Sequence, residues 1–301
     1  MFKADPTDVK MLRDRTGVGM MECKNALTEA NGNMDKAIEY LREKGLAAAA
    51  KKAGRIAADG LVNAYVADKK NVGALLEMNC ETDFVAMNAD FKKFVQDITE
   101  LIAIENPINV SVLSELRMAD GRAVKEVLTE NIQIFGEKIN IRRFARYEVN
   151  GVGIIHSYIH SDLLTQGKVG VILECSADNI AITNSPEFAS LMNDLVLQIT
   201  AYKPDYVRKE DIPADIIKHE KDIYLARAMN EGKPQAIAEK IMQGRVEKFY
   251  REVCLLEQPY LRDESKTISD MIQDINSKLD AKCISVVRFT RYEKGEGIDK
   301  N

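Results

Sequence analysis

The sequence predicts an α+β fold, with a three-helix module at the N-terminus and a duplicated core of two antiparallel-sheet half-domains. Three observations predict it: helix-capping residues punctuate the first 45 residues, a set of strand-forming segments occurs twice, and one long helical pattern is broken by a Gly/Pro turn. We expect the module with its connector at 1–56, the core halves at 57–150 and 151–301, and a helical hairpin inserted at about 213–249.

Capping residues divide the N-terminal segment into three short helices. Aspartate or asparagine before a helix, proline at its first position and glycine after its end are the expected signals. The Ala/Lys-rich stretch 46–58 then predicts a helical connector. Three short helices in this space resemble a ubiquitin-associated-like module. The expected spans are Asp5-Pro6 to Gly17, Met20 to Ala30, and Asn33-Met34 to Lys44, the last ended by Gly45.

The second of these helices has one apolar face. Successive residues turn by about 100°, so Met21 falls roughly opposite that face, beside Lys24. An exposed methionine is either an adaptable contact point for a partner or a lone surface residue without consequence, and the sequence leaves both readings open. The residues that share the expected core face are Met20, Cys23, Ala26, Leu27 and Ala30.

The remainder of the chain contains an internal duplication. Two strand-like segments joined by a polar loop predict a hairpin in each copy, the second with a loop four residues longer. A helical pattern then opens at Phe91 in the first copy and at Phe188 in the second, and a further segment predicts the closing strand of each half. The matched segments are GLVNAYV (60–66) with GIIHSYI (153–159), VGALLE (72–77) with VGVILE (169–174), and RFARYE (143–148) with RFTRYE (288–293).

The second copy carries an extra helical segment. The pattern runs from about Pro213 to Phe249 and is broken once, at Gly232-Lys233-Pro234. Two helices joined by a short turn fold back as an antiparallel pair, so we expect a projecting arm. Simple packing of the pair within the domain is the alternative.

One short stretch differs between the two copies. With Glu77 aligned to Glu174, the pair Asp83-Phe84 falls opposite Ile180-Ala181. The first copy thus has an acid followed by a large aromatic residue where strand meets helix. Phe84 is then either a core residue or an exposed residue that inserts into a pocket of a partner. The sequence leaves both open.

Composition excludes several classes of protein. The formal net charge of −5 disfavours a direct binder of DNA or RNA, and no apolar run is long enough to span a membrane. The five cysteines form no CxxC pair and are expected to be reduced and mostly buried. The N-terminus has no signal or transit pattern, so we expect a cytoplasmic protein.

No arrangement of residues predicts catalysis. The sequence has neither a Walker phosphate loop nor a dinucleotide fingerprint. His156 and His160 fall in or beside a predicted strand, so their spacing does not build a helical zinc site, and His219 stands alone among charged residues. We therefore expect no enzyme, no cofactor and no metal site.

Several specific motifs, in order over nearly the whole chain, resemble the elongation factor Ts family. This resemblance implies a guanine nucleotide exchange factor, not an enzyme, that acts on the GTPase elongation factor Tu. Some members continue with a further C-terminal helix that touches the GTPase, and we expect that contact to be absent here. The motifs are LRDRTGVGMMECKNAL (12–27), NCETDFVA (79–86) with the TDFV signature, NIRR (140–143), GKP (232–234) and GEGI (295–298).

The resemblance also implies a role for the TDFV residues. In the family the Asp-Phe pair intrudes beside the switch region of the GTPase and disturbs its Mg²⁺ coordination, while the phosphate-binding loop shifts. Carried over, Phe84 is the inserted residue and Asp83 its polar companion. Thr82 and Val85 would fix the turn.

The other implied contacts with the partner come from two places. Arg13, Met20, Met21 and Lys24 would grip the GTPase domain. His160, which we expect in the longer second hairpin loop, matches a position that faces the third domain of elongation factor Tu.

Alternatives remain at this point. A homodimer, or a heterotetramer with the partner, through the core or the hairpin is left open. An adaptor that uses only its ubiquitin-associated-like module is the competing function, and an enzyme ranks third.

Overall fold

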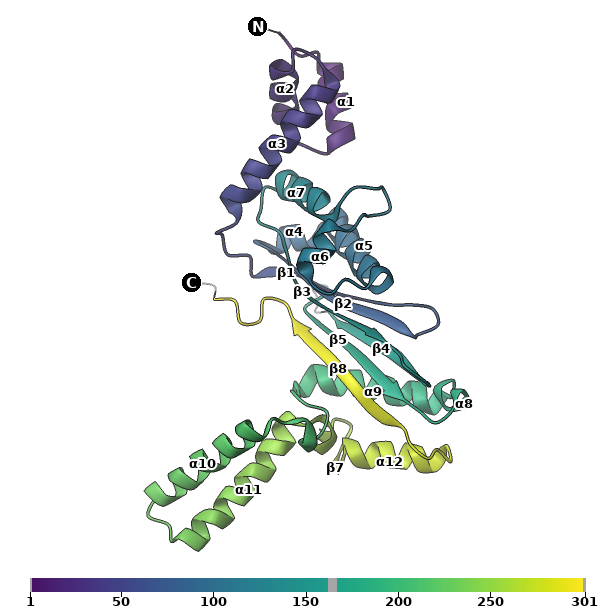
Figure 1. The fold of residues 1–301 in the computed structure, drawn as a ribbon, viewed down its shortest axis with the longest axis vertical. Helices are drawn as coiled ribbons and strands as arrows, with labels where there is room; N and C mark the ends of the chain where they lie inside the picture. The colour runs from purple at the N-terminus through teal and green to yellow at the C-terminus, as the bar shows by residue number, and fades with distance from the viewer. Residues whose placement is uncertain (1, 162–166, 300–301) are drawn as a thin grey trace.

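The computed structural model describes residues 2–161 and 167–299. Its core has four layers, in the order helices, sheet, sheet, helices (Figure 1). The N-terminal module stands on the helices of the first half, and a helical hairpin projects from the opposite end. Both large sheets are antiparallel. The predicted α+β class is confirmed.

The N-terminal module consists of α1 (Pro6–Thr16), α2 (Met20–Glu29) and α3 (Met34–Lys52). The predicted caps of α1 are confirmed: the Asp5 carboxylate accepts the N–H of Thr7 at 2.7 Å, and Gly17 ends the helix with φ 68°. The Asn33 side chain caps α3. The buried apolar residues of the module are Ala4, Val9, Leu12, Val18, Cys23, Ala26, Leu27, Ala37 and Leu41.

The expected end of the third helix at Gly45 is wrong. Helix α3 runs through Gly45 to Lys52, because the alanine-rich run that follows favours helix. At Gly45 the helix passes close to α7 (Val124–Phe135): a Cβ there would lie 2.7 Å from Oε1 of Gln133, the far end of a side chain that can shift to make room. Only the first part of the expected helical connector is therefore helical, since α3 ends at Lys52.

The first half forms a three-stranded sheet in the order β1-β2-β3, covered on one face by helices. The predicted hairpin and closing strand are confirmed, and the helix predicted at Phe91 buries that ring completely. The elements are β1 (Asp59–Val66), β2 (Val72–Cys80), α4 (Asp83–Met87), α5 (Ala89–Glu105), α6 (Val110–Glu115), α7 and β3 (Asn140–Glu148).

The second half repeats this plan with a sheet in the order β4-β5-β8. Its predicted hairpin and closing strand are confirmed, while the longer hairpin loop includes residues 162–166, which lie outside the described residues. The elements are β4 (Gly153–His160), β5 (Val169–Ser176), α8 (Ile180–Thr183), α9 (Pro186–Tyr202), η1 (Lys209–Asp211), α10 (Ala214–Asn230), α11 (Gln235–Val253), η2 (Leu255–Glu257), β6 (Pro259–Tyr260), β7 (Asp263–Thr267), α12 (Ile268–Lys278) and β8 (Ser285–Glu293).

The duplication extends to an irregularity in the sheets. The β2–β3 register shifts between Glu77 and Met78, and the β5–β8 register shifts between Glu174 and Cys175. A bulge at the same place in both halves re-aims the side chains that follow it.

The two sheets pack face to face. Because side chains alternate along a strand, Ala74 and Leu76 of β2 face the helices while Leu75 faces the second sheet. Two glycines allow the sheets to approach closely: a Cβ at Gly73 would meet Ile155 of β4 at 2.9 Å, and one at Gly170 would meet Val62 of β1 at 2.5 Å.

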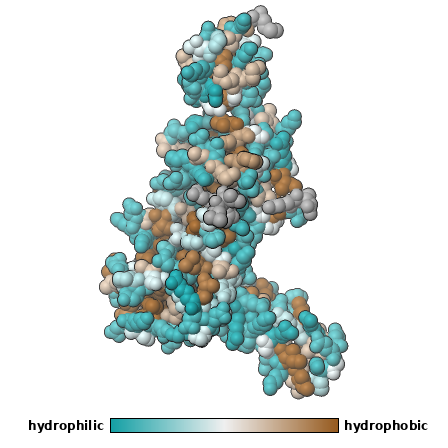
Figure 2. Space-filling view, turned by 180° about the vertical axis from the view of Figure 1, so that it is seen from behind, coloured by the Kyte–Doolittle hydropathy of each residue, from teal (hydrophilic) through white to brown (hydrophobic). Residues whose placement is uncertain are grey.

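The helical hairpin of α10 and α11 is the predicted antiparallel pair, and it ends at Val253 rather than near Phe249. It projects from the core as an arm (Figure 1). Apolar residues gather on the surface of this hairpin, at the lower right of Figure 2. The exposed large apolar side chains of α10 and α11 are Ile223, Met229, Ile237 and Ile241.

The boundaries predicted for the three domains, at 56/57 and 150/151, stay a prediction. Across residues 2–161 and 167–299, no helix combines the length and apolar character that a membrane crossing requires.

The close approach of the sheets makes Gly170→Ala destabilising. The added methyl group has no room beside Val62 and Leu75, both buried, so we expect a loss of about 1–3 kcal/mol in the free energy of unfolding. Gly244→Ala is the matched control. It lies in α11 with no atom within 4 Å of the added Cβ, so it should stabilise the protein by up to about 1 kcal/mol. Urea unfolding of both variants measures the difference, and equal effects would contradict the packing argument.

Candidate partner-binding site

Phe84 is an exposed aromatic residue in the predicted TDFV site. Its side chain is 79% exposed, at the second position of the short helix α4, and Asp83 beside it is also exposed. Val85 and Ala86 point inward and are buried in the core of the first half. The alternative that Phe84 is a core residue is therefore wrong.

The turn that carries α4 is held by side chains from elsewhere in the chain. One carboxylate oxygen of Glu137 accepts the backbone N–H groups of Glu81 and Thr82, each at 3.0 Å. Its other oxygen accepts the Thr82 hydroxyl at 2.5 Å. The Cys80 thiol donates to the Thr82 carbonyl at 3.1 Å. Thr82 is thus fixed through its N–H, its carbonyl and its hydroxyl.

The Cys80 thiol remains protonated at neutral pH and so can donate this bond. Burial, together with the nearby carboxylates of Asp59 and Glu137, raises the pKa of Cys80 to about 12. A buried thiol in this state acts as a small apolar residue with a weak donor rather than as a nucleophile.

The same turn is tied to the connector of the N-terminal module. Glu81 accepts the backbone N–H of Lys138 at 2.6 Å and pairs with Arg55 at 3.3 Å. The Lys138 ammonium donates to the Arg55 carbonyl at 2.8 Å. Segments 81–82, 137–138 and Arg55 therefore lie side by side.

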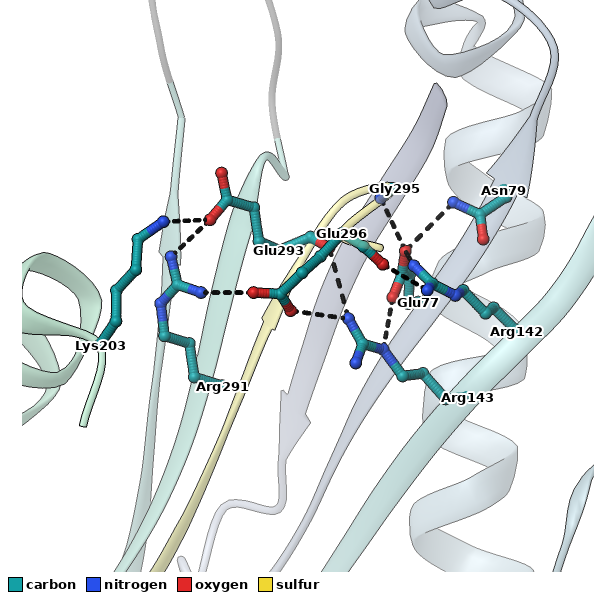
Figure 3. Close-up of polar contacts among 9 residues, drawn as sticks. All are labelled: Glu77, Asn79, Arg142, Arg143, Lys203, Arg291, Glu293, Gly295 and Glu296. Atoms are coloured by element: carbon teal, nitrogen blue, oxygen red, sulfur yellow. Dashed lines mark hydrogen bonds and ion pairs between the residues drawn. The ribbon is translucent and has the colours of Figure 1, made fainter. Parts of the chain in front are cut away.

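The strand that leads into this turn, β2, carries the buried carboxylate of Glu77 (Figure 3). It has no exposed surface and accepts hydrogen bonds from Arg142 at 2.8 Å, Arg143 at 2.6 Å, the Gly295 N–H at 2.8 Å and the Asn79 amide at 3.2 Å. Burial pushes the pKa of Glu77 upward, but the Gly295 N–H and the two guanidinium groups outweigh it. The pKa of Glu77 therefore lies below its ordinary value.

Residues 294–298, which we call the C-terminal strap, cover this carboxylate. Gly295 adopts φ 71°, and a Cβ there would lie 2.2 Å from the Ala58 carbonyl oxygen, so only glycine fits. Lys294 pairs with Asp59 at 2.6 Å, and Glu296 pairs with Arg143 at 3.2 Å. The strap thereby joins the end of β8 to the start of β1.

The strand before the strap is held by a second group of charges (Figure 3). Glu293 accepts hydrogen bonds from Lys203 and Arg291, each at 2.8 Å. These two cations lower the pKa of Glu293 to about 2.

The implied gripping residues are all exposed on α1 and α2 of the N-terminal module. Arg13, in the last turn of α1, is exposed, as are Met21 and Lys24 of α2. Met21 is 65% exposed, so its expected position away from the core is confirmed. The roles of these residues stay a prediction.

The expectation that Met20 faces the core is wrong, because its side chain is 41% exposed. Met20 is the first residue of α2, where a side chain tilts back past the end of the helix instead of onto its neighbours. Cys23, Ala26 and Leu27 on the same face are buried as expected, and Ala30 is half-buried.

His160 is the last residue of β4 rather than part of the loop, because its backbone pairs with Val169. The ring is exposed, and its Nδ1 lies 3.1 Å from the Tyr158 hydroxyl. His156 lies on the same strand beside Asn193, and His219 on α10 is exposed, so the three histidines do not meet. Within the described ranges no three His, Cys, Asp or Glu side chains form a group that could hold a metal ion.

The site residues implied by the sequence thus fall in three places: the Thr82 turn, the α1–α2 end of the module, and the end of β4. Sequence reasoning missed Glu137, Cys80 and Glu77, which hold the first of these. One signal was present for Glu77, since it recurs in the duplicate as Glu174 and faces a recurring arginine in the closing strand.

Comparison with known proteins gives the family. A family model described as elongation factor TS matches residues 81–296, from the Thr82 turn to the C-terminal strap. A relative named elongation factor Ts from Symbiobacterium thermophilum is 47% identical over 292 residues, which is 97% of this chain and 92% of the relative. The chain belongs to the elongation factor Ts family. Elongation factor Ts from Clostridium acetobutylicum is also 47% identical, over 293 residues covering 97% of this chain and 92% of the relative. The one from Clostridium perfringens is 45% identical over 292 residues, with 97% and 93% covered.

Membership of the elongation factor Ts family supports a role in translation elongation, as a nucleotide exchange factor for elongation factor Tu. The earlier expectation of this family, from the motifs at 12–27 and 79–86, is confirmed.

The buried carboxylate gives a prediction on stability. Glu77→Gln leaves two guanidinium groups facing a neutral amide, so we expect a loss of about 3 kcal/mol in the free energy of unfolding. The control Glu174→Gln changes a carboxylate that is also buried but that has a single partner, Arg288, whose side chain is 46% exposed and can turn to water, so it should cost less, about 1–2 kcal/mol.

The pH dependence of the free energy of unfolding separates the effect of the Glu77 charge from an effect of packing. The folded-state pKa of Glu77 is lowered, so its stabilising contribution is present above its ordinary value of 4.5 and is lost as pH falls through the folded value. Unfolding measured from pH 6 down toward about pH 3 should therefore show a shallower fall in stability for Glu77→Gln than for the wild type. Parallel curves would contradict this account.

Proposed function

We propose that this chain binds elongation factor Tu in its GDP-bound form, disturbs the Mg²⁺ and phosphate site, and promotes release of GDP so that GTP can bind. The observation that carries the proposal is Phe84, a large aromatic residue held almost fully in solvent on a fixed turn, in a chain of this family. A large aromatic side chain that a partner buries on binding is the kind of residue that supplies much of the binding energy of an interface.

In this proposal Phe84 inserts beside the switch region of the GTPase, and Asp83 competes for hydrogen bonds there. Mg²⁺ demands near-octahedral geometry and is held by few protein ligands together with the nucleotide phosphates. Displacing those ligands, with a shift of the phosphate-binding loop, removes much of the binding energy of the nucleotide. Val85, buried below, and Thr82, held by Glu137, keep the turn in place.

The N-terminal module supplies affinity. Arg13, Met20, Met21 and Lys24 form an exposed group of two cations and two flexible apolar side chains on α1 and α2. Methionines adapt to irregular surfaces, and the cations orient the contact. His160, at the end of β4, would meet the third domain of the partner.

Linkage sets the size of the effect. If the factor weakens nucleotide binding by some ratio, the nucleotide weakens factor binding by the same ratio. A ratio of about 10⁴ needs roughly 5.5 kcal/mol of differential binding. A single hot spot supplies about 2–4 kcal/mol, so Phe84 acts together with other contacts. The factor itself makes and breaks no covalent bond.

Phe84, the inserted residue, sets the rate of GDP release when elongation factor Tu is saturated with the factor. Phe84→Ala should leave folding intact, because the ring is exposed, and should lower the rate of GDP release at saturating factor by at least about tenfold, matching a hot-spot loss. Release of labelled GDP from elongation factor Tu is timed against factor concentration. If the melting temperature falls strongly while GDP release per folded molecule is unchanged, Phe84 supports the fold and does not drive the release of GDP.

The gripping residues set the concentration of the factor at which GDP release approaches its maximal rate. Met21→Glu should change stability by no more than about 0.5 kcal/mol, as a surface change. If Met21 contacts the GTPase equally with and without nucleotide, more factor is needed but the saturated rate stays near wild type. An adaptor without exchange activity would bind through this module and leave GDP release unaccelerated.

A further inference from the structure

We propose that Glu137 is a positioning residue for Phe84: its carboxylate, reaching from the loop between α7 and β3, holds the turn at residues 81–82 that leads into α4 and thereby keeps the aromatic ring in the presented direction. The inference rests on the proposed function. It concerns a residue far from TDFV in the sequence and outside the segment that would touch the partner.

Helix α4 cannot hold its own start. It has five residues, and its N-cap residue Thr82 makes no side-chain hydrogen bond to the helix. The backbone supplies a 3.3 Å bond from the Ala86 N–H to the Thr82 carbonyl. A helix this short is unstable without outside support, because nucleation fixes several residues for few bonds.

Glu137 supplies that support. Its carboxylate accepts the N–H groups of Glu81 and Thr82 and the Thr82 hydroxyl. A charged acceptor makes stronger hydrogen bonds than a neutral one and also opposes the positive end of the helix. The hold is reciprocal, since Glu81 accepts the Lys138 N–H at 2.6 Å and fixes the loop that carries Glu137.

The second half provides an internal comparison. The β-strand registers place Glu77 opposite Arg143 and Glu174 opposite Arg288, so Lys282 occupies the position of Glu137. There the N-cap residue Asn179 caps α8 itself by accepting the Ile182 N–H at 3.1 Å. In the half without Asp-Phe, the N-cap side chain thus bonds to its own helix; in the half with Asp-Phe it does not, and the N-cap residue Thr82 is instead held from outside by Glu137.

Packing does little to fix the direction of Phe84, since the residue is 79% exposed. Its direction follows from the backbone of α4, which is held from inside by buried Val85 and Ala86 and at its start by Glu137. Loss of the carboxylate frees the start of the helix while the inner contacts remain.

The experiment measures GDP release from the partner GTPase at saturating factor, using the full-length chain. Glu137→Ala removes the clamp. The matched control is Asp178→Ala, which removes a carboxylate that accepts two backbone N–H groups, of Lys282 and Cys283, at the equivalent junction of the second half. Both changes should lower the melting temperature to a similar degree, so stability alone does not separate them.

Glu137→Ala should lower the saturated rate about fivefold to tenfold, because only the fraction of molecules with α4 in place is competent. Asp178→Ala should leave it unchanged. Glu137→Gln keeps an oxygen for the two N–H groups and should restore at least half of the loss. In the Phe84→Ala background, Glu137→Ala should add nothing further, because it acts through Phe84.

The outcomes are distinguishable. If Phe84→Ala releases GDP at the wild-type rate, the proposed function fails and the role of Glu137 fails with it. If Phe84→Ala is slow and Glu137→Ala is not, or their losses multiply, or glutamine rescues nothing, the inference alone is overturned. If Glu137→Ala does not fold, the variant Thr82→Val tests the contact between Glu137 and the turn instead. It removes the hydroxyl that Glu137 accepts, and a saturated rate equal to wild type would overturn the clamp.

Discussion

A carboxylate with no access to water organises this molecule. Removing Glu77 from solvent is costly unless several donors meet its charge, and the structure supplies four, from β2, β3 and the C-terminal strap. The donors are therefore constrained as well. Arg142 and Arg143 fix the bulged end of β3, and Gly295 brings the strap against Ala58 at the start of β1. The strand that bears Glu77 leads directly to the Thr82 turn.

The duplicated core gives this arrangement a symmetric base. Arg143 stacks on the Tyr292 ring and Arg288 on the Tyr147 ring, each with its guanidinium carbon 4.2 Å from the ring centre. The Tyr147 hydroxyl lies 2.7 Å from that of Thr290, so each sheet contacts the closing strand of the other. Each half then departs from the common plan in its own way. The first adds a second arginine and the Glu137 clamp, and the second adds the hairpin of α10 and α11.

An exposed aromatic residue works as an inserted group only if its direction is fixed before the partner arrives. A loop that becomes ordered on binding loses conformational entropy, which lowers the affinity. A turn that is already held in place avoids this loss. Thr82 is held at three of its polar groups, and the connector is tied to the same place by Arg55. The turn that carries Phe84 and the connector that carries the N-terminal module are therefore held by the same segment, residues 137–138.

The sequence by itself determined the helices with clear caps, the hairpin of α10 and α11, the two copies of the sheet and the family. These depend on neighbouring residues or on comparison of one segment with another, as at Asp5, Asn33 and the repeated RFxRYE strand. It named the TDFV residues only through resemblance, and left open whether Phe84 was buried. The course of α3 through Gly45 and the exposure of Met20 follow from local features that the prediction misread: the alanine-rich run, and the position of Met20 at the start of α2. Tertiary structure decided that Phe84 is exposed and which distant residues hold its turn. The physical reason is distance along the chain. Glu137 holds a turn 55 residues before it, and Gly295 donates to a carboxylate 218 residues before it, so local patterns carry no trace of either contact.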